Sequence, residues 1–306
     1  SSLKLRVAFD THGFPIGQAL LPRQLLYRLH GGLQFGIKIR GATSSTWPKK
    51  SFNVEFRDPH DRDLNVRFLD FSRESDWILF GSHFIDQTRL HNPVVYGLSN
   101  RMGRRAPETQ PVELFLSQNG DGVVDESDYY GVVHLMEKIK RDDDRVDIAD
   151  LERSDTTEPE ISGGYMLKID DRDSDETSID GSLLVIDPPA SELTDVQRDW
   201  ISDYVDDFEA ALASPSPSDP QTGYPAFIDE DSFVDLHIID QLSKNIDTNI
   251  HSGYMYKDRG GKLFRGPTWD HDRAFGASGE EPDTFSNTAD VRARSGWWSV
   301  SYTHLR

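Results

Sequence analysis

Two aspartates lie two residues apart in a short segment near the C-terminal end of the chain. The segment is PTWDHDRAFG, residues 267 to 276, and it places Asp270 and Asp272 on either side of His271. Carboxylates this close destabilise each other unless a positive charge lies between them. A lysine, an arginine or a metal ion would serve, and the segment alone leaves these three alternatives open.

A third carboxylate is expected to reach the same place. Asp247 follows an apolar, helix-like stretch, residues 229 to 246, and precedes Asp270 by 23 residues. The residues between them, HSGYMYKD, RGG and KLFRG, are typical of a β-hairpin, whose two ends lie together. This is the layout of a phosphoryl-transfer centre, in which one aspartate accepts the proton of the substrate hydroxyl and another holds Mg²⁺. Aspartates are abundant in this chain, so the spacing by itself is a weak signal.

A separate segment, SQNGDGVVDESD, has the pattern of a twelve-residue calcium loop. Gly122 stands at position 6, where such loops turn sharply. Position 1 is serine and position 12 is aspartate, which resembles the extracellular, dockerin-like loops. The alternative is a polar hairpin tip with an Asp-Gly turn. The expected calcium ligands are Ser117, Asn119, Asp121, Val123 through its carbonyl, Asp125 and Asp128.

Composition limits the classes of function. The 306 residues carry a formal net charge of −20 and 36% hydrophobic residues, enough for a large core. Such an acidic chain is unsuited to general nucleic-acid binding and favours cations and basic partners. A salty habitat would give the same charge. There is no cysteine, which excludes disulfides and thiolate metal sites.

The sequence contains no apolar run long enough to span a bilayer. A weak calcium loop fills where calcium is millimolar, so we expect an exported or surface protein. The chain begins without methionine, and its last residues, 300–306, read as a non-native tail. We therefore expect a fragment truncated at both ends.

Hydrophobic periodicity predicts a mixed α+β chain without internal repeats. Helices are expected at 86–102 with Asp86 as N-cap, at 191–213 opened by Ser191 or Thr194, and at 229–246. The acidic stretch 140–160 is expected to be a flexible, solvated loop. Strands are expected in pairs at 34–57, at 111–117 with 129–139, at 163–170 with 182–189, and at 251–266.

Several motifs, in order, resemble the CotH family of atypical protein kinases, first known from spore coats. They are IRGATSSTWPKKSFNVEFRD, DQTRLHNPVVYGLSNRMGRRAPETQPVELFL, YYGVVHLMEKI and GGYMLKID, followed by FVDLHIIDQLSKNIDTN with PTWDHDRAFG. The last pair is the most specific, and together the motifs cover most of the chain. The resemblance implies a kinase-like fold over residues 1–299. A strand-rich N-lobe would span about 1–185 and a mixed helical C-lobe about 186–299, with the calcium-type loop, 117–128, as an insertion.

The resemblance also assigns roles to the aspartates on both sides of the predicted hairpin. Asp247 would be the catalytic aspartate, and Asp270 and Asp272 would bind the metal. Kinase catalytic loops carry a metal-binding asparagine five residues beyond the aspartate, and here that position is Ser252. Asn249 lies nearer and would have to substitute.

Other residues would bind the nucleotide. Arg40, Ser44, Lys49 and Lys50 lie in a hydroxyl-rich, basic turn suited to phosphates. Further candidates for the nucleotide site are Glu137 and Lys168 as a supporting ion pair, and Phe264 and Trp269 for stacking on adenine or for packing the hairpin.

The resemblance therefore implies a Ser/Thr protein kinase that uses ATP with Mg²⁺ or Mn²⁺, carries a structural Ca²⁺, and acts on an exported, basic protein. Two other classes remain open. One is a non-catalytic surface module that binds calcium or a partner, which the Ser252 departure favours. The other is a metal-dependent phosphohydrolase that uses the same aspartates.

Overall fold

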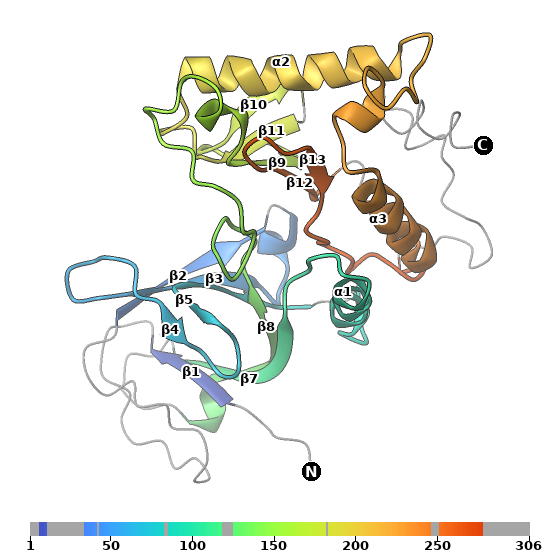
Figure 1. Cartoon of the computed structure of the whole chain (residues 1–306). Coiled ribbons are helices and arrows are strands. Elements are labelled where there is room, and N and C mark those ends of the chain that lie inside the picture. Colours follow the sequence, from blue (N-terminus) through green and yellow to red (C-terminus); the bar gives the residue numbers. More distant parts are fainter. Residues whose placement is uncertain are drawn as a thin grey trace. The chain divides into compact units, whose positions relative to one another are not determined.

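A computed structural model describes residues 6–10, 34–41, 43–82, 85–117, 125–181, 183–245 and 251–277 (Figure 1). These residues form a mixed α+β structure, as expected. Contacts divide the chain into two compact units. The N-terminal unit comprises Ser1–Gln87 and Glu108–Lys138, and the C-terminal unit comprises Thr88–Pro107 and Ile139–Arg306. The chain passes between the units after residues 87, 107 and 138, and the lobe boundary expected near residue 185 stays a prediction.

The N-terminal unit is built on a six-stranded sheet. Its two antiparallel hairpins, β2–β3 and β7–β8, confirm the strand pairs expected at 34–57 and 111–139. Only the β1–β7 pair is parallel within the described residues. A small β4–β5 pair (Val66–Arg67, Arg73–Glu74) lies outside this sheet. The strand order is β1 (Arg6–Asp10), β7 (Thr109–Ser117), β8 (Tyr129–Glu137), β6 (Asp76–Phe80), β3 (Ser51–Arg57) and β2 (Gln34–Arg40).

Alternation of side chains forms the core of this sheet. Phe52, Val54 and Phe56 on β3 all point to the buried face, as a period of two requires. Trp77 and Leu79 on β6 are fully buried against them. The ladder of strands therefore owes its register to one shared apolar face.

The C-terminal unit contains an antiparallel five-stranded sheet. Both predicted hairpins are present, and the acidic turn between β9 and β11 contains a further strand, β10. Strand β12 pairs with β9 so that Tyr254 faces Lys168 and Gly253 faces Ile169. This register places residue 252 beside the end of β9. The strand order is β10 (Thr177–Asp180), β11 (Leu183–Asp187), β9 (Tyr165–Ile169), β12 (Gly253–Lys257) and β13 (Leu263–Arg265).

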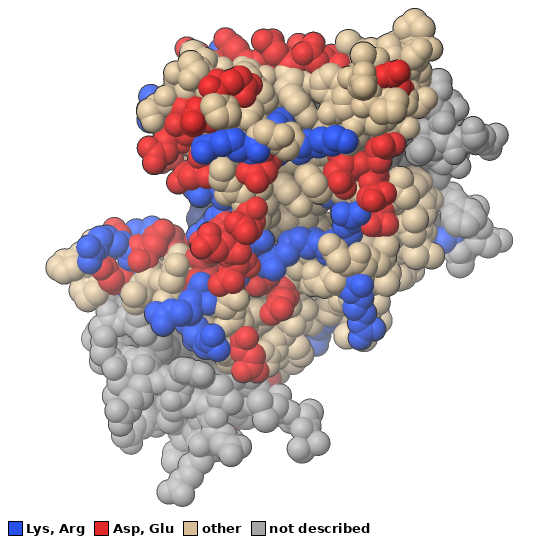
Figure 2. Space-filling view, viewed as in Figure 1, with Lys and Arg blue, Asp and Glu red and all other residues tan. Residues whose placement is uncertain are grey.

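Helix α2 (Asp195–Leu212) covers one face of this sheet (Figure 1). Ile201, Val205 and Phe208 recur at helical spacing and are buried in the same core as the strands. The outward face carries a row of exposed carboxylates, seen along the top of Figure 2. The expected amphipathic helix is thus confirmed, with exposed aspartates on its solvent side.

Helix α1 (His91–Arg101) lies alongside α3 (Glu230–Ser243), and the two pack through Val95, Leu236 and Ile239 (Figure 1). The expected N-cap of α1 was wrong. The helix begins after Leu90, and Asp86 is buried in the segment before it.

The stretch 140–160 is not the flexible, solvated loop that its charge predicted. It is irregular, but Val146, Ile148 and Leu151 are buried. The prediction from charge was wrong because apolar residues stand between the carboxylates and are buried in two hydrophobic clusters, Val146 and Ile148 in one and Leu151 in the other.

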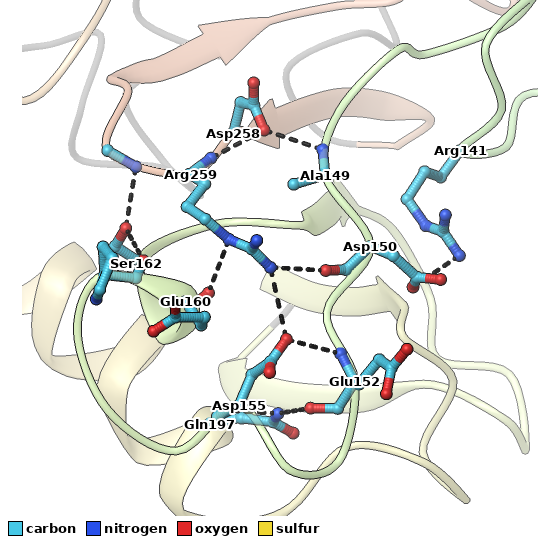
Figure 3. Close-up of polar contacts among 12 residues, drawn as sticks. Arg141, Ala149, Asp150, Glu152, Asp155, Glu160, Ser162, Gln197, Asp258 and Arg259 are labelled. Atoms are coloured by element: carbon cyan, nitrogen blue, oxygen red, sulfur yellow. Dashed lines mark hydrogen bonds and ion pairs between the residues drawn. The ribbon is translucent and has the colours of Figure 1, made fainter.

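One arginine ties this stretch to the turn between β12 and β13. Arg259 donates to the carbonyls of Asp150 (2.8 Å) and Glu160 (3.3 Å) and to the carboxylate of Asp155 (3.3 Å), as Figure 3 shows. The donors of a guanidinium are arranged in a rigid, planar fork, so one arginine that binds several acceptors holds two chain segments firmly together. The far end of the hairpin is therefore anchored, and the hairpin can deliver residues 266–277 to a fixed place.

Lys257 of β12 is buried among aromatic rings. Its ammonium donates to the carbonyls of Ser162 (2.6 Å) and Gly261 (2.8 Å) and lies 4.6 Å from the ring centre of Tyr204 and 5.1 Å from that of Trp200. Burial nevertheless lowers the pKa of Lys257 to about 8.

Among the described residues, no helix combines the length and the apolar character needed to cross a membrane.

Thr194 is the predicted N-cap of α2, and it is confirmed. Its hydroxyl accepts from the Gln197 amide at 3.3 Å, and the Gln197 side chain accepts from the Thr194 amide at 3.0 Å. We expect Thr194→Ala to lower the free energy of unfolding by about 1 kcal/mol, measured by urea denaturation. Ser191→Ala, the other predicted cap, should leave it unchanged. Equal losses in both variants would contradict the assignment.

The buried ammonium makes stability depend on pH. The unfolded chain binds a proton at Lys257 up to about pH 10.5, whereas the folded chain loses it near pH 8. Below pH 8 the folded chain has to keep a charged ammonium in a buried place, and this lowers the free energy of unfolding. Between pH 8 and 10.5 only the unfolded chain binds the proton, so the free energy of unfolding should rise over this range. Lys257→Met should lack this rise, and Lys262→Met, an exposed lysine of the same hairpin, should keep it. Parallel pH profiles for wild type and Lys257→Met would refute this prediction.

Candidate functional site

The acidic segment 267–277 leaves strand β13 and runs without regular structure beside α1 and the end of α3. Its first residues are tied to α1 and to the segment after it. The Thr268 amide donates to the Arg105 carbonyl at 2.9 Å, and the Thr268 hydroxyl lies 2.6 Å from that of Ser99. These contacts fix where the segment starts.

Side chains bind the main chain of Asp270 on both sides. The Asp270 amide donates to the Tyr96 hydroxyl of α1 at 3.1 Å. The Asp270 carbonyl accepts from the side-chain amide of Asn245, just after α3, at 3.2 Å. A residue held at both its N–H and its C=O has little freedom to rotate.

The next two residues are held in the same way, again from α1. The His271 amide donates to the Asn92 side chain at 2.7 Å. The Asp272 carbonyl accepts from Nδ1 of His91 at 2.9 Å, which fixes the His91 tautomer with its proton on Nδ1. Side chains thus replace the strand partners that this stretch of backbone lacks.

The Asp270 carboxylate is half-buried and accepts a hydrogen bond from the Ser252 hydroxyl at 3.0 Å. Both residues have a left-handed backbone, each with φ of 58°. That conformation costs a non-glycine residue about 1–2 kcal/mol. Two such residues in side-chain contact indicate a local geometry that the surrounding fold enforces, as is common at functional sites.

His271 is fully buried, and its Nε2 lies 3.2 Å from the carboxylate of Asp240, in the interior of α3. Arg265 of β13 is also buried, and the negative charge of Asp240 opposes the lowering of the Arg265 pKa by burial. His271 therefore points into the protein, away from any metal that Asp270 would bind.

The two aromatic candidates pack within the unit. Trp269 is buried and stacks on Tyr96, with ring centres 6.1 Å apart and an edge contact to Tyr254. Phe264 stacks on Tyr256 at 5.3 Å. Both residues therefore pack against neighbouring aromatic rings, one of the two roles expected for them. Stacking on adenine, the other role, stays a prediction for Trp269 and Phe264.

Lys168 lies on β9, opposite Tyr254, and is surrounded by carboxylates. Its ammonium is 2.6 Å from Glu176 and 3.7 Å from Asp170. Asp170 in turn lies 3.6 Å from Nδ1 of His251, the neighbour of Ser252. The carboxylates around Lys168 therefore lie next to Ser252 and the Asp270 site, because β9 pairs with β12.

The Glu137 partner proposed for Lys168 belongs to the N-terminal unit. Glu137 is buried, and its carboxylate accepts the Glu108 amide at 3.0 Å. The two residues lie in different units, so their pairing stays a prediction.

The basic turn of the N-terminal unit uses its lysines on main-chain carbonyls. Lys50 donates to Ser45 (2.6 Å) and Trp47 (3.4 Å), and Lys49 donates to Val132. The turn thus has a defined shape, with Arg40 and Ser44 half-buried beside it. Phosphate contacts for these four candidates stay predictions.

In the calcium-type loop, the structure describes only the end. The Asp125 amide donates to the Asp128 carboxylate at 3.0 Å, and the Asp125 carboxylate accepts from the amide and hydroxyl of Ser127. The Ser127 hydrogen bonds lower the pKa of Asp125. Ser117 ends β7, and Asn119, Asp121 and Val123 lie outside the described residues.

The predicted catalytic Asp247 and the metal candidate Asn249 also lie outside the described residues. Within the described ranges, no group of three or more acidic or histidine side chains is arranged to hold a metal ion. Asp272 is half-buried and lies two residues after Asp270 in the same segment.

Sequence reasoning missed the residues that hold the segment: Asn92, Tyr96, Asp240 and Asn245. One signal was available. Asn92 and Tyr96 are four residues apart, so they share a face of α1, and that face is the buried one. A polar residue on the buried face of a helix indicates a specific hydrogen-bonding partner.

No curated protein sequence matches the chain. A model of one protein family, described as CotH kinase protein, matches residues 37–303. The match covers most of both units and every residue of the site described above, and it confirms the resemblance seen in the motifs. The chain therefore belongs to the CotH kinase family.

Proposed function

We propose that this protein is a Mg²⁺-dependent kinase that transfers the γ-phosphoryl group of ATP to serine or threonine hydroxyls of a protein. Membership of a kinase family gives the reaction class. The observation that carries the proposal is the Asp270 carboxylate, held on a backbone whose polar groups are bonded by side chains of α1 and Asn245.

The donor chemistry of the segment fits a magnesium ion. Mg²⁺ binds one or two protein carboxylates and completes its shell with water and phosphate oxygens. Asp270 would hold it, with Asp272 and Asn249 as further ligands. The metal, when bound, would neutralise the charge that develops on the phosphates. The Ser252 hydroxyl orients the Asp270 carboxylate by donating to one of its oxygens.

Asp247 is the proposed acceptor of the substrate proton. It lies in a short segment whose two ends both contact Asp270, through Asn245 on one side and Ser252 on the other. Asp247 follows Asn245 by two residues and precedes Ser252 by five in the sequence. Chain connectivity therefore supports a site shared by Asp247 and Asp270.

A basic segment of an exported protein suits this site as substrate. Exposed carboxylates of the β9–β10 turn follow Asp170, which adjoins the Asp270 site. Opposite charges across a protein surface speed encounter and select partners. The calcium-type loop, 117–128, would take Ca²⁺ outside the cell.

One observation favours a non-catalytic module instead. Ser252 occupies the position of the metal-binding asparagine, and its hydroxyl is bonded to Asp270. A site that lacks a second metal ligand would bind nucleotide weakly. A third candidate function is that of a metal-dependent phosphohydrolase that uses the same aspartates.

The test is Mg-ATP binding by calorimetry and transfer of labelled phosphate to a basic Ser/Thr peptide. Asp270→Asn is the variant of choice because asparagine tolerates the left-handed backbone. We expect it to weaken Mg-ATP binding by about 100-fold or more, since a first ligand matters at least as much as its outer partners. Asp207→Asn, an exposed carboxylate of α2, is the matched control and should bind and transfer as wild type does.

A folded wild type that binds no Mg-ATP, with or without calcium, would contradict the proposal and favour the non-catalytic module. Release of phosphate without labelling of the peptide would favour the phosphohydrolase.

A further inference from the structure

The contact between Asp240 and His271 joins helix α3 to the centre of the acidic segment. Asp240 is 3% exposed and His271 is 0% exposed, and their side chains lie 3.2 Å apart. His271 is the residue between the two aspartates, so its side chain and the Asp270 carboxylate leave the backbone one residue apart. Whatever fixes His271 also limits how that carboxylate can move.

The hydrogen-bond pattern gives the direction of this contact. An ionised carboxylate only accepts, so Nε2 of His271 carries the proton and donates to Asp240. Nδ1 of His271 is buried and has no partner among the described residues. The imidazole is therefore held by a single polar contact, which makes Asp240 its one polar anchor in this part of the structure.

A buried polar pair is a poor way to stabilise a core. Replacing such a pair by apolar residues of similar volume is often neutral or stabilising, because the desolvation penalty is removed. An apolar residue at position 271 would also fill the space beside Tyr96, whose ring has an edge contact with His271. The charge of Asp240 also offsets the burial of Arg265, but that charge needs no imidazole at 271, whereas the directional contact with His271 specifies one arrangement of the segment.

We infer that Asp240 is a positioning residue: acting through His271, it fixes the main chain of residues 270–272, so that the Asp270 carboxylate is in place before any ligand arrives. Tyr96 and Asn92 hold the same stretch from α1, and Asp240 holds it from α3. The segment is thus clamped between two helices. The value of this clamp for metal binding rests on the proposed function, but the clamp itself does not.

The experiment uses the full chain and three variants of α3. Asp240→Asn keeps an oxygen that can accept from His271 but removes the charge. Asp240→Leu removes the acceptor and keeps the branched shape of the side chain. Asp231→Asn, an exposed carboxylate on the same helix, is the matched control. Hydrogen exchange of the Asp270 and His271 amides is compared with exchange of the Met255 amide in the neighbouring strand, and Mn²⁺ affinity is measured in parallel.

We expect Asp240→Leu to unfold below the wild-type temperature, because it leaves His271 without its acceptor and the buried Arg265 without a nearby negative charge. Exchange of the Asp270 and His271 amides should rise about tenfold more than exchange of the Met255 amide, and Mn²⁺ binding should be about tenfold weaker. Asp240→Asn should show a smaller change in the same direction, and Asp231→Asn none. A role in stability alone would instead raise exchange across the whole unit.

A folded Asp240→Leu variant with wild-type exchange at both amides would overturn the inference. If Asp240→Leu does not fold, Asp240→Asn decides: unchanged exchange at 270 and 271 overturns the inference, and a selective rise supports it. If the wild type binds no Mn²⁺, the proposed function fails, while the exchange measurement still decides the role of Asp240.

Discussion

Within the described part of the chain, no strand or helix backbone bonds with the main chain of residues 270–272, and the site in the C-terminal unit depends on this constraint. A buried or half-buried amide that lacks a partner costs about 1–3 kcal/mol. The fold meets that demand with side chains of Asn92, Tyr96 and Asn245, whose positions depend on α1 lying beside α3. The helix pair is therefore part of the site and more than a support for it.

The β12–β13 hairpin, which precedes the segment, is held in place by contacts at its turn and along its first strand. Arg259 and Asp258 hold its turn against residues 149–160, and Lys257 holds its first strand under α2. At the other end, the β9–β12 register places Ser252 where its hydroxyl meets the Asp270 carboxylate. Anchored at both ends, the hairpin fixes the path of the segment between α1 and α3. Such preorganisation lowers the cost of binding an ion, because little remains to be ordered.

How far the sequence predicts this structure depends on whether a feature is local. The hairpins, α2 and its Thr194 cap follow from periodicity and capping chemistry within a few residues. Asp270 itself was identified by its motif. The true start of α1, the packing of 140–160 and the role of Asp240 were not predicted, since each depends on residues far away in the chain. His271 shows the difference well: nothing in its place between two aspartates identifies Asp240 as its partner, and only the packing of α3 shows it buried against that residue.

The central claim is that Asp270 holds a divalent metal on a preformed loop. Its most direct test is a crystal structure of the full chain with Mn²⁺ and a non-hydrolysable ATP analogue, with the metal located by its anomalous scattering. The account predicts a manganese peak about 2.1 Å from a carboxylate oxygen of Asp270, with the main chain of residues 270–272 unchanged. A peak bound elsewhere, with the Asp270 carboxylate still bonded only to Ser252, would contradict it.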